Sequence, residues 1–550
     1  MPRFIIRHGK LEKYEGTAER VSVPEDVTQI GPRAFARNKY IKEIVIPNTV
    51  RSISPHAFFS CSSLTRITVP GSVTALEEFT FNRCRALTEV TLESGVTATG
   101  GRLFSGCDSL RRINIPDTLT KLHPQTFCGC EALKDITVDE GNPAYRTEDG
   151  ILYTKDGSTL IAYAVGNRDR ELRIPEGVTV IGDRAFERGD SLIKVFLPHS
   201  VTAIGEAAFL GCENLNAPVI PKGLKRIGSA AFHSCSSLTT VYISETVTEI
   251  GDEAFANCTA LTEISVSEKN PAYSSVDGSL YNKSGSILVS YATGRADPSF
   301  TVPEGVEEIG VGAFSGNTSL IEVTLPETVT EIGDFAFQSC EWLKRVNLPK
   351  GLKEIKTSVF EKCTQLTHVN VPEGVTAIGP FAFADCRSLK DLILPDGITS
   401  IGDHAFSDCV GLKRAVIPNS VEKIGVQAFS ECDGLDEFTV KPYLITMLEE
   451  DTVARTVAVR SYLAAHPYGS IPRKDAEYLT ACISDSIWEL TDKLIDFPPY
   501  VRFLLGRVDR ELFDPDALLR ACRNAEARAL LLDHINSEGG NNVINKDYTL

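Results

Sequence analysis

The hydrophobic and polar positions of the chain follow one pattern that returns every 23 residues from Pro24 onward. Counted from a recurrent proline, Val or Leu comes at position +3, Ile at +6, Ala-Phe at +10 and +11, Cys at +14, Leu at +17, and two apolar residues at +20 and +22. Neither the 3.6-residue period of a helix nor strict alternation describes the unit as a whole. A fixed period of this length is typical of a repeat architecture.

The unit occurs fifteen times, in blocks of five, four and six copies. The phenylalanine at +11 is present in every copy, and only Glu93 and Ser244 replace the proline. The apolar segment before a proline, such as residues 389–394, predicts a short strand that the proline ends, and the Glu-Gly or Asn-Thr pair after it predicts a turn. So short a unit cannot bury its own apolar side chains, and the copies must therefore stack as a solenoid.

Two related inserts, at 139–174 and 267–302, interrupt the repeat. Both contain Asn-Pro-Ala-Tyr and both have a segment that closes on a tyrosine, Tyr163 or Tyr291. Alternating residues and Asp-Gly or Ser-Gly turns predict β-hairpins, and the segment that ends at Tyr14 predicts the same hairpin in front of the first repeat. The hairpins could be binding loops, but structural elaboration is the favoured interpretation.

After Val440 the spacing of apolar residues becomes helical, first over 445–463 and then over 483–494. Asp514 and Pro515 have the residue types of an N-cap and a first helical position, and they predict one helix over 516–535. We interpret this region as a cap on the last repeat, with a separate interaction module as the alternative.

The predicted organisation follows from these boundaries. It comprises an N-terminal hairpin cap (1–22), three repeat blocks (23–138, 175–266 and 303–440), the two hairpin inserts (139–174 and 267–302) and a C-terminal helical domain or cap (441–550).

Charge and hydropathy limit the partners. The chain has 56 basic and 73 acidic residues, a formal net charge of −17, so nucleic acid is not an expected partner. No apolar run is long enough for membrane insertion, and the first residues lack the hydrophobic core of a secretory signal. We therefore expect a cytoplasmic protein, in which the fifteen cysteines need not be paired.

Candidate chemistry is sparse. The nine histidines are scattered without metal-ligand spacing, and the glycines near Gly310 belong to the repeat and not to a nucleotide loop. No nucleophile elbow, phosphate-binding loop or zinc motif is present, so we predict no catalytic, cofactor or metal residue and no enzyme. Twelve cysteines occupy +14, and the first repeat of each block has Asn38, Gly189 or Asn317 there instead. A buried structural thiol explains this slot better than redox or metal chemistry does.

The outward positions of the strands are where binding information should lie. Four residues before the proline, charges alternate in sign along the first block, which predicts neighbouring ion pairs. The middle block instead has apolar residues two positions before the proline, and a weaker apolar pair occurs in the last block. The candidate protein-binding residues are Lys194, Phe196, Val219, Thr240 and Tyr242, with Ile393 and Val416 as the weaker patch. Coverage by an insert or by another copy of the chain is an equally good explanation.

The unit IP-x-x-V-x-x-I-G-x-x-A-F-x-x-C-x-x-L-x-x-V-x-I resembles that of the BspA-like leucine-rich repeat proteins, from Pro24 to about Val440. The resemblance implies a curved, right-handed bacterial leucine-rich repeat solenoid of short parallel strands with no catalytic residues, which binds other proteins or surfaces. We expect a non-enzymatic scaffold that binds an unidentified protein through its outward face, in an oligomeric state left open. The alternative is a cell-surface adhesion or host-interaction protein, as in many relatives, exported by a non-classical route or with a signal outside this sequence.

Overall fold

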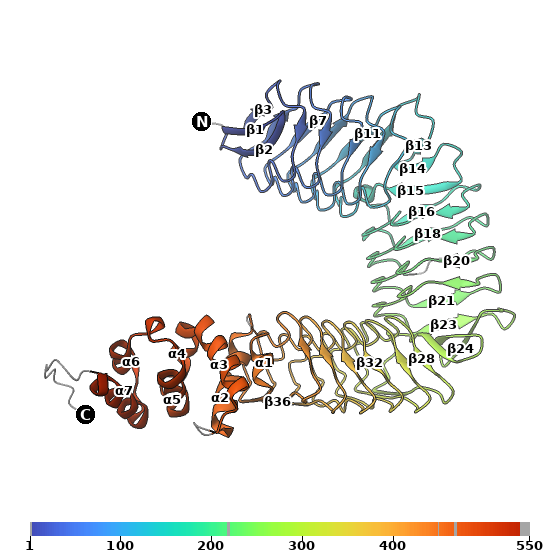
Figure 1. The fold of residues 1–550 in the computed structure, drawn as a ribbon. Coiled ribbons are helices and arrows are strands. Elements are labelled where there is room, and N and C mark those ends of the chain that lie inside the picture. The colour runs from blue at the N-terminus through green and yellow to red at the C-terminus, as the bar shows by residue number, and fades with distance from the viewer. Residues whose placement is uncertain (1–2, 217–219, 449, 467–469, 539–550) are drawn as a thin grey trace. The chain divides into compact units, whose positions relative to one another are not determined.

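In the computed structural model the chain forms two compact units, Met1–Arg295 and Ala296–Leu550, and the description covers residues 3–216, 220–448, 450–466 and 470–538. In both units each 23-residue repeat forms one rung of a β-solenoid (Figure 1). The predicted solenoid of parallel strands, with hairpin inserts and a C-terminal helical region, is therefore confirmed.

Most of the described rungs contribute a strand before the proline position and a second, two-residue strand after it. Corresponding strands of successive rungs pair in parallel, and a residue such as Ile44 faces its equivalent 23 positions later, Ile67. The strands of the first block before the proline are β3 (Arg20–Ser22), β5 (Glu43–Val45), β7 (Arg66–Val69), β9 (Glu89–Leu92), β11 (Arg112–Ile115) and β12 (Asp135–Val138). Those after it are β4 (Gln29–Ile30), β6 (Ser52–Ile53), β8 (Ala75–Leu76) and β10 (Ala98–Thr99).

Each predicted hairpin begins a new stretch of the ladder that the two-residue strands after the proline form. The N-terminal hairpin is β1 (Arg3–Arg7) and β2 (Lys10–Glu15), and the inserts have three antiparallel strands each, not two: β13 (Tyr145–Glu148), β14 (Ile151–Thr154) and β15 (Thr159–Tyr163), then β24 (Tyr273–Val276), β25 (Ser279–Asn282) and β26 (Ile287–Ser290). A 3₁₀ turn, Val165–Asn167, follows β15. Leu11 of β2 pairs with Ile30, and Leu160 of β15 pairs with Ile181, so the two hairpins are equivalent.

The middle block completes the first unit with the same two ladders. Its strands before the proline are β16 (Glu171–Arg173), β18 (Lys194–Phe196), β21 (Thr240–Ile243) and β23 (Glu263–Val266), and those after it are β17 (Val180–Ile181), β19 (Ala203–Ile204), β20 (Arg226–Ile227) and β22 (Glu249–Ile250).

In the second unit the ladder before the proline is interrupted once. It contains β27 (Ser299–Thr301), β29 (Glu322–Thr324) and β31 (Arg345–Val346), then β34 (Asp391–Ile393), β36 (Arg414–Val416) and β38 (Glu437–Thr439). The other ladder contains β28 (Glu308–Ile309), β30 (Glu331–Ile332), β32 (Glu354–Ile355), β33 (Ala377–Ile378), β35 (Ser400–Ile401) and β37 (Lys423–Ile424). Next to the gap, the Asn347 side chain replaces backbone pairing, because its amide accepts from Leu325 N and donates to Leu325 O, both at 2.8 Å.

The described part of the C-terminal region forms seven short helices. They are α1 (Pro442–Ile445), α2 (Thr452–Ala465), α3 (Arg473–Asp485), α4 (Ile487–Leu494), α5 (Pro498–Arg507), α6 (Pro515–Ala521) and α7 (Ala525–Glu538), with a 3₁₀ turn at Arg510–Leu512. Asp514 caps α6 as predicted, by accepting from Asp516 N. The single helix expected over 516–535 is wrong, because it breaks at Cys522. Asp496 accepts from the backbone of Asn524 there, and the Asn524 side chain accepts from Ala527 N as the cap of α7.

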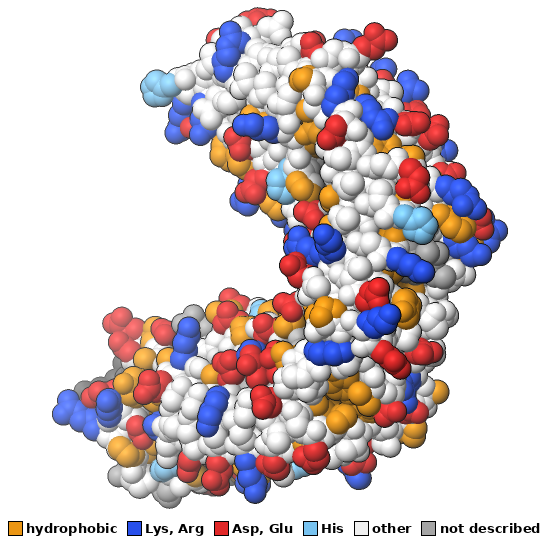
Figure 2. Space-filling model, turned by 90° about the vertical axis from the view of Figure 1, so that its right-hand side faces the viewer, with side chains coloured by type: hydrophobic (Ala, Val, Ile, Leu, Met, Phe, Trp, Pro, Cys, Tyr) orange, Lys and Arg blue, Asp and Glu red, His pale blue; other side chains and the backbone are white. Residues whose placement is uncertain are grey.

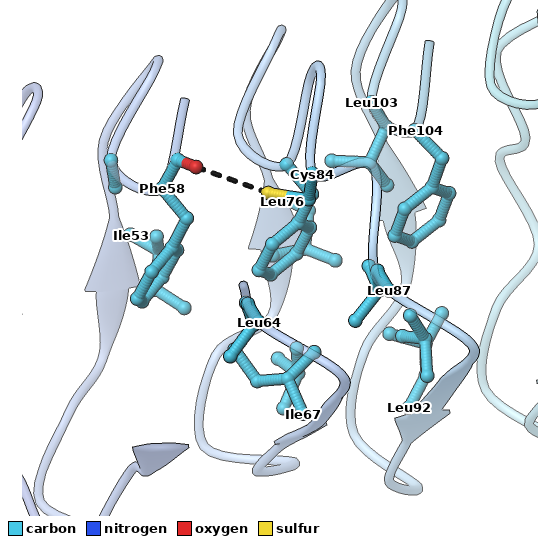
Figure 3. Close-up of a cluster of buried hydrophobic side chains, with 14 of the residues drawn as sticks. Ile53, Phe58, Leu64, Ile67, Leu76, Cys84, Leu87, Leu92, Leu103 and Phe104 are labelled. Carbon is cyan, nitrogen blue, oxygen red and sulfur yellow. Dashed lines mark hydrogen bonds between the residues drawn. The ribbon is translucent and has the colours of Figure 1, made fainter. Parts of the chain in front are cut away.

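The core of each block contains a column of stacked phenylalanine rings, one from each of its rungs, as Figure 3 shows for part of the first block. In the first block the ring centroids of Phe58 and Phe81 lie 5.2 Å apart, and in the second unit those of Phe383 and Phe406 lie 5.3 Å apart. The hairpin tyrosines begin these columns: Tyr14 packs on Phe35 at 5.4 Å. An aromatic ring at one fixed position of each unit is therefore what joins a rung to its neighbours.

The asparagine of the Asn-Pro-Ala-Tyr motif closes the end of a block. Asn142 is buried, and its amide donates to the carbonyl oxygens of Pro116 (2.7 Å) and Leu119 (2.9 Å) while its oxygen accepts from the backbone N–H groups of Ala144 and Tyr145 (2.8 Å each). Asn270 makes the same four bonds in the second insert. The Asn142 amide thus takes the place of the Ser or Thr hydroxyl that donates to the equivalent carbonyl between inner rungs, as Ser72 does to Val50, and the Asn142 oxygen holds the turn into the insert.

The segment that leads into α2 supplies a hydrogen-bond acceptor to the last rung. In an inner rung the phenylalanine N–H donates to a carbonyl of the next rung, as Phe383 does to Ala405. At the last rung Phe429 N donates instead to a carboxylate oxygen of buried Asp451, at 3.2 Å. Burial raises the pKa of Asp451 to about 6.

Candidate protein-binding surface

The strands before the proline have one face in the core and one in solvent. In β21, Val241 and Ile243 are buried, while Thr240 and Tyr242 between them are exposed. This alternation holds the outward side chains on a paired backbone, so they form ordered columns along the solenoid. Figure 2 shows acidic and basic side chains interspersed on the face it presents, with hydrophobic side chains in small groups among them.

The middle block carries most of the predicted residues. Tyr242 has 55% of its surface exposed; Thr240 is exposed on the same strand, and Lys194 is exposed on β18. Phe196 faces outward but is only half-exposed. Val219 lies outside the described residues, so its place in the column is not part of the structure.

Phe196 is only partly exposed because Arg173, which the sequence pattern did not single out, lies over its ring. The guanidinium carbon of Arg173 lies 4.0 Å from the Phe196 ring centroid, in the range of a cation–π contact. The two residues are partners on the paired strands β16 and β18. Arg173 occupies the column position 23 residues earlier, so the repeat register alone could have identified it.

The weaker patch is divided in the same way. Ile393 has 58% of its surface exposed, whereas its partner on the next strand, Val416, is half-buried. The patch therefore offers one exposed aliphatic side chain rather than two.

The alternating charges four residues before the proline form ion pairs at some rungs. The shortest distances between charged atoms are 3.5 Å for Arg20–Glu43, 3.4 Å for Arg112–Asp135 and 3.3 Å for Arg414–Glu437. All six side chains are well exposed, so each pair is expected to contribute less than ~1 kcal/mol. In the first block, Glu43, Arg66 and Glu89 also line a shallow hollow of about 420 Å³ on this face.

The cysteines at +14 are buried and unpaired, and each thiol donates to a carbonyl of the preceding rung. The Cys84 Sγ lies 3.1 Å from the carbonyl oxygen of Phe58 (Figure 3), and the other eleven thiols make the same bond to the equivalent phenylalanine at 3.1–3.4 Å. The first repeat of a block has no regular rung before it, which explains why cysteine is missing there. Asn38 and Asn317 act differently, because their side-chain oxygens accept from the backbone of their own turn.

These thiols are expected to be unreactive in the folded protein. Burial raises the pKa of Cys107, Cys212, Cys258 and Cys340 to about 12, so little thiolate exists near neutral pH. A thiol reagent at pH 8 should therefore label the native slot cysteines at least about 100-fold more slowly than the chain unfolded in guanidinium. Fast labelling of Cys386 or its equivalents in the native state would instead indicate a reactive site.

The described residues contain no group of three or more His, Cys, Asp or Glu side chains arranged to hold a metal ion. In the same part of the chain, no helix combines the length and the hydrophobicity that a membrane span needs.

Several solved structures similar to this chain are bacterial leucine-rich repeat proteins. A leucine-rich cell surface protein from Faecalibacterium prausnitzii is 28% identical, with 77% of this chain and 93% of that chain covered and a TM-score of 0.39. A leucine-rich repeat protein from Eubacterium ventriosum is 27% identical over 52% of this chain and 91% of that chain, with a TM-score of 0.42. One from Bacteroides ovatus is 24% identical over 80% and 92%, with a TM-score of 0.33. No curated protein matches the sequence.

The sequence itself matches the family described as the BspA type leucine-rich repeat region. Six copies of that region cover residues 13–134, 167–282, 298–413 and 353–461, which is most of the chain. The matched residues include the stacked phenylalanines and the hydrogen-bonded cysteines of all three blocks. The chain belongs to the BspA type leucine-rich repeat family.

Proposed function

We propose that this protein is a non-enzymatic scaffold that binds a protein partner through the outward strand face of its middle block. The observation that carries the proposal is Tyr242, a large amphipathic ring that stands exposed on a paired strand of a rigid sheet. Tyrosine and arginine are enriched at the energetic centres of protein interfaces. Because the strand holds the ring in place, binding would cost little side-chain entropy.

The Arg173–Phe196 pair supports the same surface. Its cation–π contact fixes both side chains before a partner arrives and leaves the edge of the ring and the guanidinium donors accessible. With Lys194 and Thr240 they form a mixed aromatic and polar surface, the composition typical of a non-obligate protein interface. The BspA type repeat family is consistent with a scaffold of this kind.

The C-terminal end of the array supports this role. A carboxylate oxygen of Asp451 accepts from Phe429 N, where an inner rung has a carbonyl of the next rung, so we assign the first C-terminal helices to capping and leave the strand faces for binding. The cytoplasm is the location that we propose for this activity.

A photo-crosslinking residue at position 242 tests the surface. It should trap a partner protein from the native cell extract, and the combined Tyr242→Ala and Phe196→Ala exchange should weaken capture by the full-length protein by about 30-fold or more. Tyr40 is the matched control, because it is similarly exposed (52%) but lies off the strand face. Equal trapping from positions 242 and 40, or capture unchanged by the double exchange, would reject the proposal.

A further inference from the structure

The five-residue turn from +9 to +13, which we call the turn face, carries opposite charge in the first and last blocks. Its backbone is nearly constant, with left-handed residues at both ends of most turns, such as Arg33 (φ 57°) with Arg37 (φ 61°) and His404 (φ 55°) with Asp408 (φ 59°). The middle residue of each turn is the core phenylalanine, which is buried in every turn except that of Phe127, where it is partly buried. The turns therefore present different side chains on one shared scaffold.

The turn face of the first block is basic and aromatic. Its sequences are RAFAR, HAFFS, FTFNR, RLFSG and QTFCG, at 33–37, 56–60, 79–83, 102–106 and 125–129, with four arginines and no carboxylate. All four arginines are exposed, and within the described residues none forms an ion pair. The nearest carboxylates along the chain, Glu77 and Glu78, precede the third turn.

Aromatic rings lie between these arginines. The Arg83 guanidinium lies 6.0 Å from the Phe59 ring centroid, and that of Arg102 lies 5.9 Å from the Phe79 centroid. Phe79 is also stacked on His56, with 4.9 Å between centroids. The contacts orient the guanidinium groups without neutralising them, because a ring carries no net charge.

The turn face of the last block is acidic. Its sequences are GAFSG, FAFQS, SVFEK, FAFAD, HAFSD and QAFSE, at 312–316, 335–339, 358–362, 381–385, 404–408 and 427–431, with four carboxylates and one lysine. Glu361 and Asp385 have nearby cations of their own, Lys362 and Arg387. Asp408 and Glu431, on adjacent rungs, are exposed and form no ion pair among the described side chains.

An exposed aromatic pair accompanies these carboxylates. Phe381 is 38% exposed and stacked on His404, with 4.7 Å between centroids, and both have positive φ. Phe79 has the same position and a φ of 56° in the first block. A bulky residue is unfavourable in this conformation, where glycine is free, so the backbone does not explain the rings. Their retention on both faces points to a role for the side chains.

We propose that the basic turn face of one copy of the chain binds the acidic turn face of a second copy. Arg83 and Arg102 lie on adjacent rungs, at opposite ends of the turn (+13 and +9), and Asp408 and Glu431 lie on adjacent rungs with both at +13. In both blocks successive rungs pair in parallel, with neighbouring strands about 4.8 Å apart. Two ladders with one period can match at several rungs at once. Guanidinium and carboxylate groups pair with bidentate geometry, and the flanking rings exclude water from such pairs.

Self-association of this kind has a definite electrostatic signature. Ion pairs at an exposed interface weaken as salt screens them, so the complex should dissociate at high ionic strength. The strand face around Tyr242 takes no part, so this inference does not rest on the proposed function. The exchange Tyr242→Ala should leave self-association unchanged.

A charge-swap experiment on the full-length protein tests the inference by sedimentation velocity over a concentration series. One variant carries Arg83→Glu and Arg102→Glu, and the other carries Asp408→Lys and Glu431→Lys. The chain tolerates these residue types in left-handed turns, as Glu253 (φ 55°), Glu431 (φ 56°) and Lys362 (φ 61°) demonstrate. Wild type should self-associate in low salt, and each variant alone should associate at least 10-fold more weakly.

Mixing the two variants is the decisive step. The reversed faces are complementary to each other, so the mixture should regain association between unlike chains, which a fluorescent label on one variant detects. Thermal unfolding of each variant alone checks that the solenoid is intact. The proposal is overturned if the wild type remains monomeric throughout or if the variants associate as the wild type does. It is also overturned if the mixture does not regain association. Binding of an acidic peptide or of oligothymidylate by a monomeric wild type would assign the basic face to an anionic partner instead.

Discussion

Exchange of Phe383 for alanine should lower the free energy of unfolding of the second unit by about 3–5 kcal/mol. The ring is 1% exposed and lies between Phe360 and Phe406, with 5.3 Å to each ring centroid. Its removal leaves a cavity in the column and leaves Phe360 and Phe406 each stacked on one side only, and the paired strands on either side prevent collapse. Denaturant unfolding followed by circular dichroism measures the effect.

Phe381 provides a control within the same turn. It is two residues away and 38% exposed, so Phe381→Ala should cost less than about 1 kcal/mol. If both exchanges cost the same, stability would not come from the phenylalanine column, and the inward and outward assignment of the turn would be wrong.

The second large effect is expected for Asn142→Ala, with a loss of about 3–5 kcal/mol from the first unit. The exchange leaves two carbonyl oxygens and two N–H groups without the partners that Asn142 supplies at 2.7–2.9 Å. Asn142→Asp should also destabilise, because a carboxylate cannot donate to the carbonyl oxygens of Pro116 and Leu119. Denaturant unfolding gives the size, and hydrogen exchange at Ala144 and Tyr145 shows whether the loss begins at the insert.

Asn114 is the matched asparagine in the same unit. It lies on the outward face of β11 and donates to Asp139 at 3.0 Å. Since that bond is exposed, Asn114→Ala should change the free energy of unfolding by no more than about 1 kcal/mol. A cost for Asn142→Ala as small as that of the control would contradict its role at the end of the block.

Much of the fold was predictable because one period is repeated fifteen times. Any single unit is ambiguous, but a shared register places every phenylalanine, leucine and isoleucine on the same inward positions. The structure has Phe58, Phe232 and Phe383 buried in equivalent places. The cysteines were predictable as buried thiols for the same reason, although the acceptor of each thiol was not.

The candidate site was predictable only in part. The pattern marks Tyr242 as outward, and it is exposed; it marks Phe196 as outward too, but the Arg173 guanidinium lies over that ring and Phe196 is partly buried. A repeat tells which side of a strand a residue is on. It does not tell which side chain of the next rung lies over it, because that depends on rotamers and on how long side chains cross between rungs.

The sequence alone determined the solenoid, its register, its inward column of phenylalanines and the places where the repeat stops. These follow from periodicity, since identical units of 23 residues can bury their apolar side chains only against each other. Tertiary structure alone decided how the ends are closed, through Asn142 and Asp451, where the helix after Asp514 breaks, and which outward rings stay uncovered. Those features depend on contacts of individual side chains outside the 23-residue unit, and the repeated pattern contains no information about such contacts.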